Sequence, residues 1–137
     1  MELTFDSMPG SPPFLLNIKI VVVDDNPDIR LLIARFLAEH GAQVFSAKNA
    51  IEGLRLVREI HPNVVLSDLA MPGRNGFELL ADIRSLDRYA GGSVPVVAMT
   101  AHKHERDLIV GIGFQELLEK PFSPDQLLAT IDSALPS

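Results

Sequence analysis

The fold of this chain is decided by one stretch, IKIVVVDDNP at residues 18–27. The run before the two aspartates is short, β-branched and almost wholly apolar, which is typical of a strand buried on both faces of a parallel sheet. Asn26-Pro27 then predicts a helix start, because Asn can cap a helix and Pro at the first helical position sacrifices no needed donor. A strand that passes directly into a helix is the repeating unit of an α/β domain.

The same alternation continues along the chain. A helix is expected from Pro27 to just before Gly41, and in the next helix Ile51, Leu54 and Val57 are expected to face inward. Single helices between strands predict an α/β domain with a parallel sheet and right-handed crossovers. Further strands are expected at residues 43–47, 64–67, 95–99 and 116–119, and further helices at about 49–60, 76–85, 103–112 and 124–134.

Composition limits the kind of protein. A chain of 137 residues with 47% hydrophobic content fits one domain with a real core. The net charge of −6 argues against a nucleic-acid-binding surface, and the absence of cysteine excludes disulfides and thiolate metal sites. No apolar run approaches the ~20 residues that span a bilayer, and the N-terminus lacks a secretory signal pattern. We therefore expect a cytoplasmic domain at residues 18–137, preceded by a Pro-rich extension or linker at residues 1–17.

Carboxylates and a lysine stand where the predicted strands end. Asp24 and Asp25 follow the first strand, Asp68 the third and Lys120 the fifth, while Thr100 follows the fourth. The carboxyl ends of parallel strands lie at one edge of the sheet, where α/β folds bind their ligands. Three carboxylates gathered there repel one another unless a cation joins them, and an oxygen-only ligand set favours Mg²⁺. The sequence therefore predicts a metal-dependent site.

Phosphoryl transfer is a reaction that suits these residue types. An aspartate can attack phosphorus and form an aspartyl phosphate, and a lysine ammonium and a threonine hydroxyl can hold phosphoryl oxygens. Taken singly, the same residues have ordinary interpretations: Asp24-Asp25 as a polar turn, Thr100 as a strand-end hydroxyl and Lys120 as a solvated charge. A dehalogenase-type phosphatase would need a second acid where Ala70 stands, and nucleotide binding lacks a glycine-rich loop after the first strand.

Four motifs in a fixed order carry a family resemblance. They are VVVDDN at residues 21–26, DLAMPGRNG at 68–76, MTA at 99–101 and KPF at 120–122. In this order and spacing, over about residues 19–135, the chain resembles the receiver domain of a two-component response regulator, with the fold of the chemotaxis response regulator. The resemblance implies a flavodoxin-like fold: a doubly wound, five-stranded parallel sheet of strand order 2-1-3-4-5.

The resemblance also implies a role for each polar residue of the site. Asp68 would be the phosphoacceptor and would share an Mg²⁺ ion with Asp25, a direct ligand, while Asp24 would act largely through water. The backbone carbonyl of Ala70 would be a further metal ligand. Thr100 would be the switch hydroxyl.

The end of the predicted fifth strand carries one match and one departure. Lys120 would clamp the phosphoryl group, and its bond to Pro121 would be cis. Leu117, however, stands where the family has its switch aromatic, usually Tyr or Phe. Output is therefore expected to use loop and helix rearrangement around Thr100 rather than the rotation of a ring. The surface of the fourth helix, fifth strand and fifth helix is expected to be aliphatic, supplied by Leu108, Ile109, Ile112 and Leu117. Some of these four must pack inward, but the spacing cannot bury all of them on one side of so short a helix.

Partners follow from the same resemblance. Phosphate would come from a histidine kinase or a histidine phosphotransfer protein, and the chain would catalyse only its own phosphorylation and dephosphorylation. It could form a homodimer through the face of the fourth helix, fifth strand and fifth helix, with no direct contact to nucleic acid or membrane. A receiver-like scaffold that signals by protein contact without phosphorylation stays open as an alternative, although no acceptor, ligand or lysine position has been lost.

Overall fold

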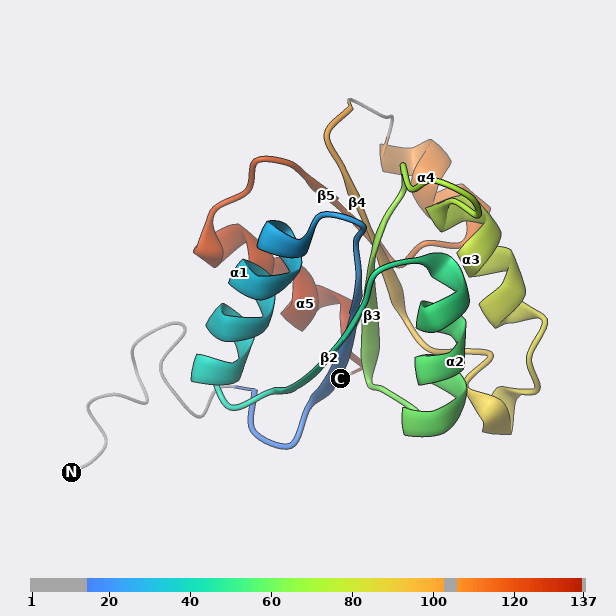
Figure 1. Ribbon diagram of the computed structural model, residues 1–137, viewed down its shortest axis with the longest axis horizontal. Helices are drawn as coiled ribbons and strands as arrows, with labels where there is room; N and C mark the ends of the chain where they lie inside the picture. The colour runs from blue at the N-terminus through green and yellow to red at the C-terminus, as the bar shows by residue number, and fades with distance from the viewer. Residues whose placement is uncertain (1–14, 103–105, 137) are drawn as a thin grey trace.

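The computed structural model describes residues 15–102 and 106–136, which fold into alternating strands and helices (Figure 1). The elements are β1 Lys19–Val23, α1 Pro27–Glu39, β2 Gln43–Ala47, α2 Ala50–Ile60, β3 Val64–Asp68, α3 Gly76–Arg84, η2 Arg88–Ala90, β4 Val96–Thr100, α4 Arg106–Ile112, β5 Glu116–Glu119 and α5 Pro124–Ala134. The strands lie in the order β2-β1-β3-β4-β5, each parallel to its neighbours. This confirms the predicted flavodoxin-like fold and its strand order.

Helices cover both faces of the sheet. α1 and α5 lie on one face, and α2, α3 and α4 on the other (Figure 1). Successive residues of a strand point to opposite faces. Val21 and Val23 therefore join the core under α2, α3 and α4, while Ile20 and Val22 join the core under α1 and α5. Burial on both faces explains why β1 is apolar almost throughout.

Side-chain caps fix where two of the helices begin. The Asn26 side chain accepts hydrogen bonds from two backbone N–H groups in the first turn of α1, as the Asn26-Pro27 pair predicted. Ser123 caps α5 in a capping box with Gln126, in which each side chain accepts from the other's backbone N–H. Both caps hold connections that carry residues of the predicted site.

The first turn of α2 differs from its expected orientation. Ile51, expected to face inward, is 73% exposed, whereas Val57 is buried as expected and Ala50 and Gly53 are buried beside it. A Cβ atom at Gly53 would lie 2.8 Å from Val23 Cγ2, so α2 approaches the sheet through its small residues. The prediction for Ile51 was wrong because α2 contacts the sheet most closely at Gly53, where there is no room for a side chain. The periodicity of apolar residues does not reveal such a contact.

Two expectations extend beyond the described part of the chain. The predicted helix at 103–112 is α4 from Arg106 onward, and its expected first residues lie outside the described ranges. Residues 1–14 of the predicted extension also lie outside them, whereas Leu15 is buried and its N–H donates to the His40 carbonyl oxygen at 2.7 Å. Across residues 15–102 and 106–136, no helix has the length and apolarity to cross a membrane.

Candidate functional site

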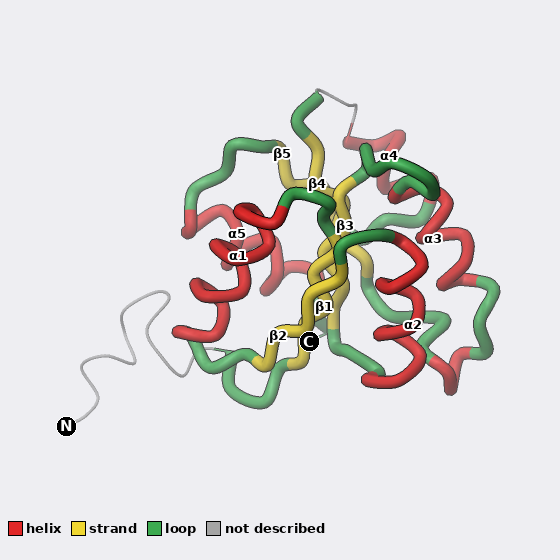
Figure 2. The backbone as a smooth tube through the Cα atoms, in the orientation of Figure 1, coloured by secondary structure: helices red, strands yellow, loops and turns green. Residues whose placement is uncertain are grey.

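The connections that follow β1, β3, β4 and β5 lie together at one edge of the sheet (Figure 2). The winding direction reverses between β1 and β3, because α1 and α2 leave toward opposite faces, and open α/β sheets bind ligands at such a reversal. The structure places one carboxylate oxygen from each of Asp24, Asp25 and Asp68 within 4.8 Å of the others. The predicted convergence of the three acids is therefore present.

The three carboxylates differ in burial and in their partners. Asp25 is exposed, whereas Asp24 is fully buried. Asp24 Oδ1 accepts a hydrogen bond from the Asn26 backbone N–H at 2.9 Å, and Asp24 Oδ2 accepts one from Lys120 Nζ at 2.8 Å. Both oxygens of Asp24 are thus occupied by the protein itself, while the carboxylate of Asp25 faces solvent.

Asp68 is buried at the end of β3, and the contacts of its carboxylate with the described residues involve one of its two oxygens. Its Oδ1 accepts a hydrogen bond from the Ala70 N–H at 3.3 Å and lies 3.7 Å from Lys120 Nζ. Among the described residues, no hydrogen bond or ion pair reaches Oδ2. Burial raises the pKa of the Asp68 carboxyl, and the Asp24 charge raises this pKa further, while Lys120 and the Ala70 N–H oppose the shift.

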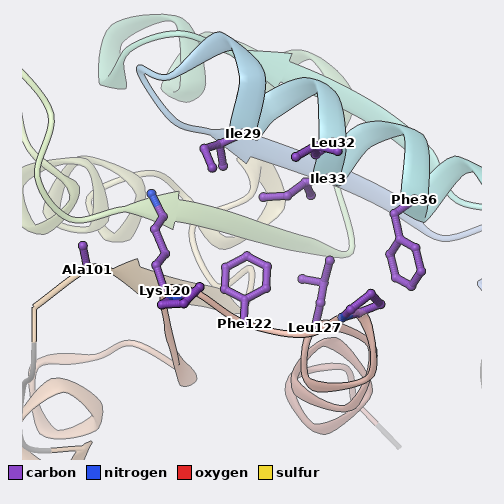
Figure 3. A pocket seen from close by; sticks show the side chains of 10 residues that line it. Ile29, Leu32, Ile33, Phe36, Ala101, Lys120, Phe122 and Leu127 are labelled. Atoms are coloured by element: carbon purple, nitrogen blue, oxygen red, sulfur yellow. The ribbon is translucent and has the colours of Figure 1, made fainter.

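Lys120 and Thr100 complete the polar group. Figure 3 shows the Lys120 side chain extending with its ammonium end beside β3, and its ammonium contacts both Asp24 and Asp68. The Lys120-Pro121 peptide bond is cis, as expected. Thr100 is buried, and its Oγ1 accepts a hydrogen bond from the His102 backbone N–H at 3.0 Å. That hydroxyl is therefore tied to the connection after β4.

Two residues that support the site did not emerge from sequence reasoning in this role. Arg30 Nη1 donates to the Asp24 backbone carbonyl oxygen at 2.6 Å, linking α1 to the end of β1. A lone cation close in sequence to an acidic pair was the only signal for it. Gly76 lets α3 begin against β3. A Cβ atom there would lie 2.4 Å from the Asp68 carbonyl oxygen.

The expected aliphatic surface lies on α4. Leu108 and Ile112 are exposed, as is Val110. Ile109 and Leu117 are instead buried in the core under α4. Some of the four named residues were expected to pack inward, and these two do so because α4 and β5 pack through them onto the domain. Leu117 thus fills interior space rather than presenting a surface residue in place of the aromatic.

The donor set suits a hard divalent cation. All candidate ligands are oxygens, and Asp25 gives the group an open side through which a hydrated ion can enter. Mg²⁺ commonly binds through one or two carboxylates and keeps several waters. Asp25, Asp68 and the Ala70 carbonyl could provide such ligands, while the occupied oxygens of Asp24 suit an indirect role through water.

Comparisons with known proteins agree with this geometry. The family model described as "Response regulator receiver domain" matches residues 20–132. The protein PilH of Pseudomonas aeruginosa is 38% identical over 120 residues, covering 85% of this chain and 97% of PilH. An uncharacterized 14.6 kDa protein of Leptolyngbya boryana is 39% identical over 119 residues, covering 85% of this chain and 89% of that protein. The structure of the chemotaxis protein CheY4 of Vibrio cholerae superposes with a TM-score of 0.79 at 28% identity, covering 86% of this chain and 98% of that one.

Proposed function

The chain belongs to the family of response regulator receiver domains of two-component signalling, and from this premise we propose that it accepts a phosphoryl group on Asp68 in an Mg²⁺-dependent reaction. The observation that carries the proposal is the group formed by three carboxylates and Lys120 at the sheet edge. Maintaining this many acids together, one of them fully buried, has little structural benefit of its own. A bound cation would relieve the repulsion among the carboxylates, and Lys120 would bind a phosphoryl group.

Asp68 is the nucleophile in this proposal. Its Oδ2 forms the new bond to phosphorus as the bond from phosphorus to the donor's imidazole nitrogen breaks, and the leaving imidazole takes up a proton. The contacts to Oδ1 from Ala70 and Lys120 hold the carboxylate in one orientation. Phosphoryl transfer depends mainly on such positioning and on charge neutralisation.

Two groups of this chain would hold the transferred phosphoryl oxygens. The Lys120 ammonium already lies 3.7 Å from Asp68 Oδ1, and the Thr100 hydroxyl could turn from the His102 N–H toward a phosphoryl oxygen. Mg²⁺, held by Asp25, Asp68 and the Ala70 carbonyl, would neutralise part of the phosphoryl charge. Because Thr100 Oγ1 is hydrogen-bonded to the His102 N–H, its movement would shift the connection between β4 and α4. This shift would change which residues of α4 are exposed.

The donor and the place of action follow from the family as part of the proposal. A histidine kinase or a histidine phosphotransfer protein would supply the phosphoryl group in the cytoplasm. Changed contacts, including self-association through α4, β5 and α5, would be the output. Exposed Leu108, Val110 and Ile112 give that face apolar area with which to bind a partner.

Incubation with acetyl phosphate, a small-molecule phosphodonor, tests the proposal. We expect a base-labile mass increase in the wild-type protein with Mg²⁺, and none in Asp68→Asn or in wild type with excess chelator. Asp125→Asn, which changes an exposed acid on α5, is the matched control and should be modified like wild type. Modification of Asp68→Asn to the same extent would contradict the assignment. No modification of the folded wild-type protein would favour the phosphorylation-independent scaffold.

A further inference from the structure

An apolar groove of about 660 Å³ lies between α1 and the start of α5. Its lining is aliphatic or aromatic apart from Lys120, whose ammonium is turned toward Asp24 instead. Figure 3 shows the side chains of the two walls facing one another. The walls include Ile29, Leu32, Ile33 and Phe36 from α1, and Phe122 and Leu127 from the other side.

The groove leaves large apolar side chains in water. Leu32 is 67% exposed, and Phe36 and Phe122 are half-buried. Apolar area of this kind is unfavourable in water and commonly marks a surface that something covers. The structure therefore raises the question of what occupies this groove.

The start of the described chain lies beside one end of the groove. Leu15 packs in the same core cluster as Ile33 and Leu127, which belong to the two walls. Its N–H donates to the carbonyl oxygen of His40, four positions beyond Phe36 along α1. Leu15, the first described residue, therefore lies at the Phe36 end of the groove.

Residues 1–14 have the reach and the composition to fill it. Their sequence is MELTFDSMPGSPPF, which contains several large apolar side chains and no basic residue. Extended, 14 residues span up to roughly 46 Å at about 3.3 Å each. The groove wall from Phe36 to Ile29 is only about 10 Å long at 1.5 Å per helical residue. The segment can thus run the length of the groove with residues to spare.

We propose that residues 1–14 of this chain bind in the groove between α1 and α5, with their apolar side chains against Leu32, Phe36 and Phe122. Because the segment is attached beside the groove, its effective concentration there is on the order of millimolar, so a weak contact suffices. Its prolines reduce the conformational entropy that binding would cost. The far end of the groove is lined by Ala101 and Lys120, so the bound segment lies next to the approach to Asp68. The proposal does not depend on phosphorylation.

A single spin label tests this binding in the full chain. The sequence has no cysteine, so Ser7→Cys provides a unique attachment point for a nitroxide. In metal-free buffer without a phosphodonor, we expect paramagnetic broadening of the methyl signals of Ile29 and Leu127. The methyl signals of Ile51, on the opposite face of the sheet, should stay sharp. Equal broadening of all three residues, or none at Ile29 and Leu127, would overturn the proposal.

Two neighbouring leucines of α1 supply the matched variants. Leu32 lines the groove and Leu31 does not, yet Leu31 is also exposed, at 54%. We expect Leu32→Glu to remove more than half of the broadening at Leu127, and Leu31→Glu to leave it unchanged. A sample of labelled chains mixed with unlabelled, isotope-enriched chains separates binding within one molecule from binding between two. Broadening in the enriched chains equal to that within labelled chains would overturn the intramolecular proposal, as would identical effects of the two variants.

Discussion

Adjacent residues at the end of β1 have opposite environments. Asp24 is enclosed and bound on both oxygens, while Asp25 is exposed. The nearby Asp68 is buried, and Lys120, the cation close to it among residues 15–102 and 106–136, is already bound to Asp24. The ionised form of Asp68 therefore lacks full compensation in the folded protein, which has a measurable consequence for stability.

Asp68→Asn should stabilise the metal-free protein at neutral pH. The pKa of Asp68 is raised above its ordinary value of 3.8, first by burial and then by Asp24. The folded protein then holds a proton on Asp68 to higher pH than the unfolded chain does. This favourable contribution is fully present below pH 3.8 and is lost as the pH rises through the raised pKa. We expect the melting temperature of the variant at pH 7 to exceed that of wild type by roughly 3 °C or more.

Thermal melts in chelator at pH 7 and at acidic pH provide the measurement. The advantage of Asp68→Asn should shrink as the pH falls toward 3.8, because wild type then also carries a neutral side chain at this position. A variant less stable than wild type at pH 7 would argue against repulsion within the carboxylate group.

At the scale of single elements, small residues control how closely helices approach the sheet. Gly53 brings α2 onto Val23, and Gly76 brings the first turn of α3 onto the Asp68 carbonyl. Arg84 performs a related task at the other end of α3, where its guanidinium donates to the carbonyl oxygens of Gly92 and Val94. These contacts hold α2 and α3 against the sheet and α3 against the connection before β4.

Gly53→Ala and Gly111→Ala should have opposite effects. Alanine normally stabilises a helix interior by about 0.5–1 kcal/mol relative to glycine. At Gly53 the new methyl group would lie 2.8 Å from Val23 Cγ2, a stiff and buried β-branched side chain. Overpacking of this kind costs about 1–3 kcal/mol, so we expect net destabilisation. At Gly111 on α4, an added Cβ would have no atom of the described residues within 4 Å outside its own chain neighbours and helix backbone, so the variant should be more stable than wild type.

Urea denaturation of the two variants measures both effects in one fold. The difference in unfolding free energy should exceed the effect of either substitution alone, because the two have opposite signs. Equal stabilisation by both substitutions would show that α2 can shift away from β1 without cost.

On the scale of the whole molecule, the acidic sheet edge should make stability respond to divalent cations. Mg²⁺ that binds only the folded protein stabilises it by mass action, by about 2.7 kcal/mol at a concentration one hundred times its dissociation constant. We expect millimolar MgCl₂ to raise the melting temperature of wild type, and Asp25→Asn to remove most of that rise. Asp125→Asn, outside the carboxylate group, should retain it.

Differential scanning fluorimetry with matched NaCl controls for ionic strength separates specific binding from screening. The same rise in Asp25→Asn as in wild type would place the cation elsewhere on this acidic protein. A melting temperature indifferent to Mg²⁺ would count against the metal site altogether.

The resemblance to receiver domains implied the strand order and the cis bond before Pro121. The residues by themselves determined the alternating parallel strands and helices and the convergence of the acids with Lys120. These follow from short segments, because an apolar run that ends in Asp predicts both a buried strand and the edge at which its last residue lies. Such patterns are contained within a few residues, and the strands and the capped start of α1 follow them.

Only the tertiary structure decided which partner each side chain has. Lys120 pairs most closely with Asp24, 96 positions away, rather than with Asp68. Arg30 binds a backbone carbonyl, and Ile51 is exposed while Gly53 is buried. Helical periodicity gives the spacing of apolar residues but not the rotation or depth at which a helix packs. Those depend on the shapes of surfaces brought together from distant parts of the chain, and that information is not present in any single stretch of sequence.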